Sequence, residues 1–204
     1  ITMEDMVISD DGLPYKVTGI YPQGLQDIYK VSFNDGSSTE SGGPHLWNVN
    51  TPMRKYRNQP FLTKQLDELK DDLILEGTSN YKWFIPITKP IQFNESEVSI
   101  DPYKLGLLLG DGSMSQNQIG ITSIDEEIIN QFEFIRQDRI TYFLDTSYFF
   151  RLQTLGLTGC KSNNKFIPKN YLYNSMQVRL ELLRGLMDSD GSIWNNGVIE
   201  YTSV

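Results

Sequence analysis

Hydrophobic residues recur with two different periods along the chain. In the first fifty residues, short runs rich in β-branched and aromatic residues alternate with glycine-containing turns. This pattern predicts strands at Tyr15–Tyr21, Ile28–Phe33 and His45–Val49. Asn34-Asp35-Gly36 is typical of a β-hairpin turn, because glycine adopts a positive φ at little cost. The front of the chain is therefore expected to be β-rich.

A helical period follows the β-rich front. Leu66, Leu69 and Leu73 recur at helical spacing. Thr63 is a candidate N-cap for this helix, and Gly77 is a candidate stop. The sequence therefore predicts one helix between these two residues.

An aromatic stretch interrupted by prolines, Tyr81–Pro90, predicts an extended linker. We place a domain boundary near residue 98, which gives domains at 1–98 and 99–204. Within the second domain the pattern alternates between helix and strand. It predicts helices at Tyr103–Gly110, Asp125–Ile135 and Ser175–Met187, and strands at Ile119–Thr122 and Thr146–Leu152.

Composition restricts the kinds of protein that the chain can be. With 39% hydrophobic and 22% charged residues, it resembles an ordinary globular protein. No apolar run reaches the roughly 18 residues that span a bilayer, and no signal-peptide pattern is present. We therefore expect an intracellular, cytoplasmic protein. One cysteine, Cys160, and one histidine, His45, exclude a disulfide framework and metal sites built on several cysteines or histidines.

Charge is spread unevenly along the chain. The formal net charge of −8 argues by itself against a nucleic-acid partner, which needs a surplus of Lys and Arg. Residues 146–187, however, hold six basic residues and one acidic residue. A basic stretch is therefore hidden within an acidic chain, and it is either a solvated face or a phosphate-contacting face.

Two predicted helices end in the same pattern. Leu105–Gly112 and Arg184–Gly191, aligned on their final Asp-Gly, each carry two small residues four positions apart. Residues four apart share one helix face, and small residues there let two helix backbones approach closely. We therefore expect the helices to pair through four small residues: Gly106, Gly110, Gly185 and Ser189.

An aspartate follows the last small residue of each helix. If the helices pair side by side, the carboxylates of Asp111 and Asp190 meet at one end of the contact. Two neighbouring carboxylates repel each other unless a cation lies between them, and hard divalent cations prefer oxygen ligands. Such a pair, holding a divalent metal beside a phosphate, is a recurring device for phosphodiester hydrolysis.

The two segments resemble the paired motifs of the LAGLIDADG (dodecapeptide) homing endonucleases. The first copy has Leu109 where the motif has an acid, whereas the second keeps Asp188. The resemblance implies that Asp111 and Asp190 are catalytic residues that bind Mg²⁺ or another divalent cation. It also implies αββαββα repeats that straddle double-stranded DNA, cleavage at a long recognition site, and a pseudo-symmetric monomer.

The residues before the second motif strengthen this resemblance. Leu155-Gly156-Leu157, Lys165-Phe166-Ile167-Pro168 and Tyr171 resemble a block found in intein-borne members of the family. This implies that Lys165 is a catalytic residue, with a phosphate contact or a plain surface lysine as the alternatives. Polar and basic side chains near the predicted strands are candidates for DNA binding: Gln116, Gln118, Arg151, Gln153 and Lys161.

Residues 14–49 resemble the Hint fold of inteins. That resemblance implies that His45 assists the acyl shift at the first splice junction, although Gly42 stands where a threonine is usual. The chain begins at Ile1 without a nucleophilic Cys or Ser, and it has no C-terminal His-Asn pair. We therefore expect an α+β fragment of an intein: a partial Hint domain with linker over 1–98, then a LAGLIDADG domain over 99–204 whose second repeat is truncated.

Three functions follow from these resemblances. The first is a DNA endonuclease whose precursor is also spliced out of flanking exteins of a host protein, with no membrane partner. The second is protein splicing as the main activity. The third is a non-catalytic nucleic-acid-binding module, either maturase-like or a decayed endonuclease.

Overall fold

The computed structural model describes residues 1–115, 117–195 and 197–202. The chain forms two compact units, Ile1–Pro90 and Ile91–Val204. The division lies earlier than the predicted boundary near residue 98, because the segment that follows Pro90 packs with the second unit. Within that segment, the Ser96 N–H donates to Oδ1 of the buried Asn174 side chain at 3.1 Å.

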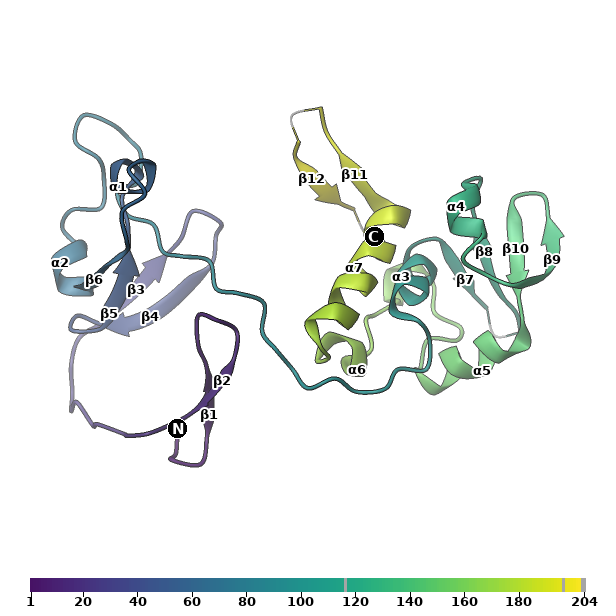
Figure 1. The fold of residues 1–204 in the computed structure, drawn as a ribbon, viewed down its shortest axis with the longest axis horizontal. Helices are drawn as coiled ribbons and strands as arrows, with labels where there is room; N and C mark the ends of the chain where they lie inside the picture. Colours follow the sequence, from purple (N-terminus) through teal and green to yellow (C-terminus); the bar gives the residue numbers. More distant parts are fainter. Residues whose placement is uncertain (116, 196, 203–204) are drawn as a thin grey trace. The chain divides into compact units, whose positions relative to one another are not determined.

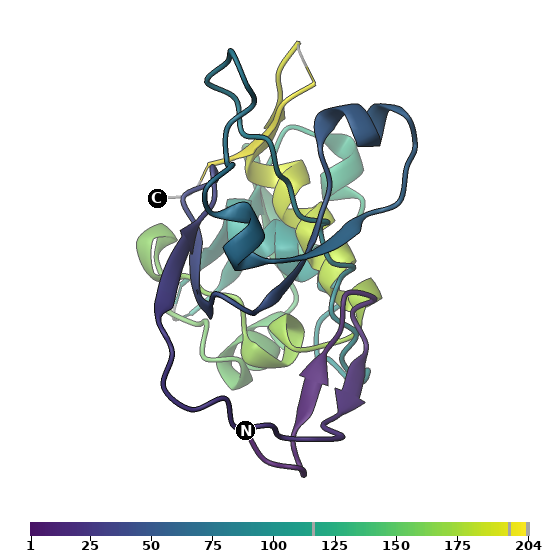
Figure 2. The ribbon, with the colours of Figure 1, turned by 90° about the vertical axis from the view of Figure 1, so that its left-hand side faces the viewer.

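The first unit is built from three antiparallel hairpins. They are formed by β1 (Met6–Ile8) with β2 (Pro14–Lys16), β3 (Ile28–Ser32) with β4 (Ser38–Gly42), and β5 (Leu46–Val49) with β6 (Leu62–Gln65). Two short helices, α1 (Pro52–Tyr56) and α2 (Leu66–Leu69), accompany the last pair. Figures 1 and 2 both show β1 and β2 standing apart from the other strands of this unit.

In the first unit the sequence predicts one hairpin turn correctly and the start of one helix incorrectly. The predicted hairpin turn is confirmed, since Gly36 has a φ of 87° between β3 and β4. The predicted helix starting at Thr63 is wrong. Thr63 lies in β6, where its hydroxyl donates to Asn48 Oδ1 on β5, and α2 begins only at Leu66. A cross-strand contact therefore overrides the helical spacing of the leucines there.

The second unit begins with helix, strand, strand, helix, strand, strand and helix (Figure 1). These are α3 (Pro102–Asp111), β7 (Gly112–Met114), β8 (Ile119–Thr122), α4 (Glu126–Ile129), β9 (Phe134–Asp138), β10 (Thr141–Leu144) and α5 (Thr146–Thr154). A short 3-10 turn (Ser162–Asn164), α6 (Lys169–Leu172), α7 (Met176–Asp190), β11 (Gly191–Ile193) and β12 (Ile199–Tyr201) follow. None of the helices in the described ranges is long and apolar enough to cross a membrane.

The second unit has one antiparallel sheet with two different faces. Its strand order is β7-β8-β10-β9. One face carries Met114, Ile121 and Leu144, which are at most 2% exposed and join the core with leucines of α3 and α5. The other face is open. The sheet therefore buries an apolar face against helices and presents a second face to solvent.

Two predicted elements of the second unit are wrong. The segment Thr146–Leu152, predicted as a strand, is helix α5, because Asp145 caps it by accepting the Ser147 N–H and Leu152 fills the core. The helix predicted over Asp125–Ile135 ends at Ile129 and is followed by β9. Phe134 of β9 packs on Tyr142 of β10 with ring centroids 5.0 Å apart, a cross-strand pairing that sequence period alone does not show.

Tyr171 ties the segment before α3 to the rest of the second unit. Its fully buried hydroxyl donates to the Ile100 carbonyl at 2.8 Å and accepts the Ile100 N–H at 3.0 Å. Tyr171→Phe leaves both backbone groups without their buried partner, so we expect a loss of about 1–3 kcal/mol in the free energy of unfolding. Urea denaturation measures this loss. Tyr173→Phe, at an exposed tyrosine of the same turn, is the control and is expected to change stability by less than about 0.5 kcal/mol.

Candidate functional site

The helices α3 and α7 lie side by side with their backbones in contact (Figure 1). Gly106 and Gly185 face each other at the crossing. A Cβ added to Gly106 would lie 2.8 Å from the Leu186 nitrogen, and one added to Gly185 would lie 2.9 Å from the Leu107 nitrogen. Because real Cβ atoms do not come this close to backbone, only glycine fits at both positions.

The same contact continues to the carboxyl ends of both helices. A Cβ on Gly110 would collide with the Ser189 side chain, so this glycine makes room for the serine. The Ser189 hydroxyl folds back onto its own helix and donates to the Leu186 carbonyl at 2.9 Å. The structure thus brings all four small residues singled out in the sequence into one contact.

Asp111 and Asp190 are the last residues of the two paired helices. The Asp190 carboxylate lies 3.2 Å from the position that a Gly110 Cβ would occupy, directly beside the turn that carries Asp111. Burial raises the pKa of Asp111, the negative charge of Asp190 raises it further, and the Lys165 ammonium opposes the increase. The pair is therefore a site of like-charge repulsion that a cation would relieve.

The donors at this point suit a hard divalent ion. Both are carboxylates, and in the part of the chain that the structure describes they are not joined by a third His, Cys, Asp or Glu to form a larger cluster. Mg²⁺ is commonly bound through one or two carboxylates, with water and substrate phosphate oxygens completing its shell. Asp111 and Asp190 therefore fit this ion better than they fit a metal that needs a closed protein cage.

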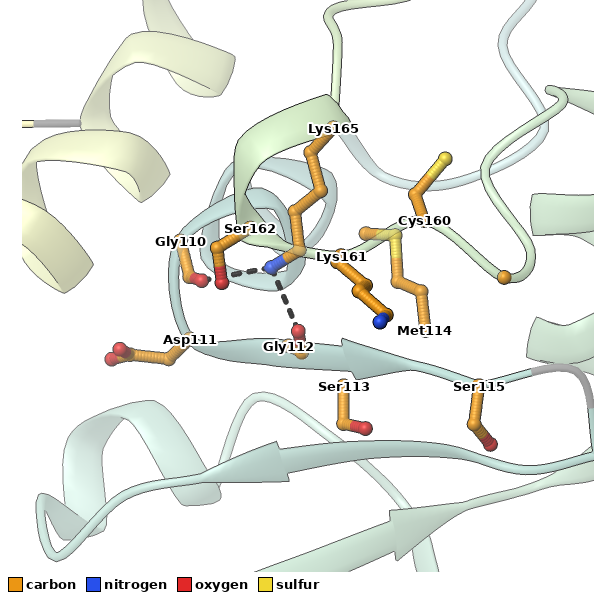
Figure 3. Close-up of a pocket in the computed structure, with 11 residues that line it drawn as sticks. Gly110, Asp111, Gly112, Ser113, Met114, Ser115, Cys160, Lys161, Ser162 and Lys165 are labelled. Carbon is orange, nitrogen blue, oxygen red and sulfur yellow. Dashed lines mark hydrogen bonds between the residues drawn. The ribbon is translucent and has the colours of Figure 1, made fainter. Parts of the chain in front are cut away.

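A second feature of this site is the ammonium of Lys165, which lies at the carboxyl end of α3 (Figure 3). Its Nζ shares its hydrogens among four carbonyl oxygens at 2.7–3.1 Å, those of Leu108, Leu109, Gly110 and Gly112. Burial lowers the pKa of Lys165, and the charges of Asp190 and Asp111 oppose that change. A cation there satisfies the carbonyls left open at a helix end and complements the helix dipole. The lysine singled out in the sequence therefore binds backbone.

Lys165→Met tests how much this contact stabilises the second unit. The substitution keeps most of the apolar stem but leaves four carbonyls without their charged donor. We expect a loss of about 1.5–3 kcal/mol in the free energy of unfolding, the range of a hydrogen bond to a charged group. Lys169→Met, at an exposed lysine nearby, is the matched control and should change stability little. Equal denaturation midpoints for the two variants would contradict the prediction.

The two motif helices are also joined by a polar contact. The Tyr103 hydroxyl on α3 donates to Asp188 Oδ2 on α7 at 2.7 Å. Burial and the nearby Asp188 charge raise the pKa of Tyr103 to about 12. At the matching position of the first motif, Leu109 is buried in the core. At this position the second motif has an acid that accepts a hydrogen bond, and the first motif has a leucine in the apolar core.

The predicted DNA-binding residues do not form one surface. Gln116 lies outside the described residues. Gln118 precedes β8 and its backbone N–H donates to Ser115 Oγ at 3.1 Å. Arg151 and Gln153 are exposed on α5, which packs against the buried side of the sheet through Leu152, so their predicted place on a strand is wrong. Lys161 is exposed and lines a cavity next to Asp111.

The open face of the sheet was missed by sequence reasoning. Thr122 and Thr141 share a hydrogen bond of 3.0 Å between their hydroxyls on neighbouring strands. The Arg136 guanidinium lies 4.2 Å from the centroid of the Phe143 ring, opposite it on the next strand. This face therefore carries hydroxyls, one basic group and one carboxylate: Ser113, Thr122, Arg136, Asp138 and Thr141. The helix predicted over Asp125–Ile135 reaches only the first two residues of β9, and the β9 sequence Phe134–Asp138 has no alternation of apolar and polar residues that would indicate a strand.

His45 belongs to the first unit and lies between β4 and β5. Its N–H donates to the Gly42 carbonyl at 3.1 Å, and its carbonyl accepts the Leu66 N–H at 3.0 Å. The exposed imidazole meets the Trp47 ring edge-on, with centroids 5.8 Å apart. Two hydrogen bonds thus fix the backbone of His45, and its ring is exposed beside Trp47.

Comparison with known proteins gives one informative likeness. The chain matches no family model. It is 27% identical over 220 residues to a replicative DNA helicase DnaB of Mycobacterium intracellulare, and the alignment covers 99% of this chain and 36% of that protein. Nearly the whole of this chain is aligned, but it spans only about a third of the length of this curated relative.

Proposed function

We propose that the chain belongs to an intein with an embedded homing endonuclease of the LAGLIDADG type, and that its second unit hydrolyses phosphodiester bonds of double-stranded DNA with Mg²⁺. The observation that carries the proposal is the pair of glycine-packed helices that ends in Asp111 and Asp190. Glycines at the crossing let the two helix backbones touch, and this close approach brings two carboxylates together at the carboxyl ends of the helices.

The order of elements supports the same proposal. α3 runs directly into the hairpin of β7 and β8, and α7 runs directly into the hairpin of β11 and β12. Between them lies the series of helices and strands expected of an αββαββα repeat. Two helices with the same carboxyl-terminal motif thus each start the same local structure, as a duplicated half-domain would.

The residues of the site divide the proposed chemistry among themselves. When bound, a divalent ion activates a water molecule and stabilises the leaving oxygen of the phosphodiester. Asp111 and Asp190 would hold this ion through their carboxylate oxygens. Lys165 fixes the last turn of α3 and thereby the backbone that carries Asp111. Lys165 is thus a positioning residue in this proposal.

The open sheet face is the proposed surface for DNA. Side chains on strands can enter the major groove, where each base pair presents a distinct pattern of donors and acceptors. Arg136, Thr122 and Thr141 offer donors and acceptors on that face. This replaces Arg151 and Gln153 as candidates for base contact.

The likeness to a helicase supports an inserted element and does not support helicase activity. A nucleotide-driven motor needs a phosphate-binding loop of the form GxxxxGK[ST], and the 204 residues of this chain contain no such motif. We propose that the matched region is an intein within a helicase precursor, whose remaining segments are the exteins. In that precursor His45 assists the acyl shift at the first splice junction.

The test uses DNA that encodes a DnaB-type helicase without the matched region. Purified chain with Mg²⁺ is expected to cut both strands close to the junction, and to leave uncut the same DNA with the region in place. Replacement of Mg²⁺ by EDTA should stop cleavage. DNA binding without cleavage at any divalent ion would instead support the non-catalytic binding module, and absence of both would refute the proposal.

A further inference from the structure

A cavity of about 630 Å³ lies beside the carboxyl end of α3, between β7 and the loop at 159–162 (Figure 3). This volume is within the range of small-ligand sites in proteins. Asp111 stands at one end of the lining, and Lys161 and Lys165 contribute the two basic side chains. Hydroxyls of Ser113 and Ser162 are also on its walls.

The two lysines of the cavity differ in what their charges contact. The Lys165 ammonium is occupied by four backbone carbonyls. The Lys161 ammonium is exposed, and no carboxylate of the described residues lies within 4.0 Å of it. An exposed ammonium without a carboxylate partner is a position that favours an external anion.

The sheet geometry indicates which anion belongs there. β7 is an edge strand of the sheet, and it starts immediately after Asp111. Base edges lie inside the groove of DNA, whereas the phosphates lie on its outer rim. If side chains of the open face contact base edges, the sugar–phosphate backbone therefore runs along an edge of the sheet. The edge strand β7 begins at the residue after Asp111, one of the two proposed metal ligands. Lys161 lines the same cavity as the residues of β7.

We propose that this cavity binds a backbone phosphate of the cleaved DNA strand, next to the phosphate that is cut, and that the Lys161 ammonium is its counter-charge. The proposal rests on the DNA-cleaving function proposed above. It assigns Lys161 to one phosphate on the strand held at Asp111, whereas Arg136 and the threonines lie on the open face of the sheet. Lys161 in this role contributes affinity that is independent of base sequence.

The experiment measures how binding of the full chain to a 30-base-pair duplex of arbitrary sequence depends on salt, with Ca²⁺ in place of Mg²⁺ to prevent cleavage. Loss of one phosphate contact lowers the slope of log K against log salt by about 0.9. Lys161→Ala is expected to show this decrease and to bind roughly three- to tenfold more weakly at 0.1 M salt. Lys161→Arg keeps the charge and should keep the slope, and Lys169→Ala is the control for loss of an exposed lysine outside the cavity.

A second measurement identifies the anion directly. Acetylation of surface amines followed by mass spectrometry should show that the duplex protects Lys161 more than Lys169. Equal slopes for Lys161→Ala and Lys169→Ala, with normal DNA binding by the unmodified chain, would overturn the phosphate subsite and leave the endonuclease proposal standing. Equal protection of Lys161 by inorganic phosphate alone would overturn its assignment to a DNA strand. A chain that binds no DNA would overturn both proposals.

Discussion

Asp111→Asn is expected to abolish metal-dependent DNA cleavage and, in the same protein, to raise the free energy of unfolding. The amide keeps the shape of the side chain but removes one of the two proposed metal ligands. Cleavage should fall by about 10²–10³-fold, as when a group that stabilises transition-state charge is removed. The gain in stability follows from the raised pKa of Asp111, since burial and Asp190 both disfavour its ionised form.

The sign of the pH dependence follows from the same shift. A folded-state pKa above the unfolded value of 3.8 means that the folded protein binds this proton more tightly than the unfolded chain. Stability from this group is therefore present below pH 3.8 and is lost as the pH rises through the folded pKa of Asp111. The asparagine variant lacks that decline, so its advantage over the unmodified protein should appear as the pH rises through this window and then stay constant.

Thermal denaturation with and without Mg²⁺ separates the two effects. At a Mg²⁺ concentration a hundred times Kd, the unmodified protein should gain about 2.7 kcal/mol, and Asp111→Asn should gain almost none. Asp188→Asn is the matched control, because it also removes a carboxylate from α7 but one that accepts the Tyr103 hydroxyl. It should keep the Mg²⁺ response and lose up to about 1 kcal/mol. A destabilised Asp111→Asn that still responds to Mg²⁺ would contradict the assignment.

Gly106→Ala is expected to destabilise the second unit strongly, although alanine is the better helix former by about 1 kcal/mol. Its Cβ would meet the backbone of α7 at Leu182 and Leu186, which cannot rotate away. Overpacking of this kind costs about 1–3 kcal/mol, and more where the contact is with backbone. We therefore expect a net loss of at least about 2 kcal/mol, and a folding defect with any larger residue.

Gly110→Ala provides a contrast that can be rescued. Its Cβ would meet the side chain of Ser189, so the double variant Gly110→Ala, Ser189→Gly should recover most of the lost stability. Adding Ser189→Gly to Gly106→Ala should not help, because the clash there is with main chain. Urea unfolding of these variants forms a double-mutant cycle. Additive losses at Gly110 and Ser189 would show that the helices are not packed as the structure has them.

Local signals were read correctly where the physics is local. The strand predicted over Ile119–Thr122 is β8, the helix predicted over Ser175–Met187 is α7 with Ser175 as its N-cap, and Gly36 closes the predicted hairpin. The aromatic residues of Thr146–Leu152 predict a strand because aromatic residues are enriched in strands, but this preference depends on what they pack against. Asp145 and the buried Leu152 decide for helix, and neither contribution is visible without the cap geometry and the core.

By itself the sequence determined that two similar helices carry small residues four apart and end in Asp-Gly, since residue type and spacing suffice for that. Only the tertiary structure decided that Gly106 opposes Gly185, that Lys165 binds four carbonyls at the end of α3, and that the open sheet face carries Arg136. The reason is physical: helical spacing is a property of one segment, whereas contacts between separate helices and strands depend on how those segments pack.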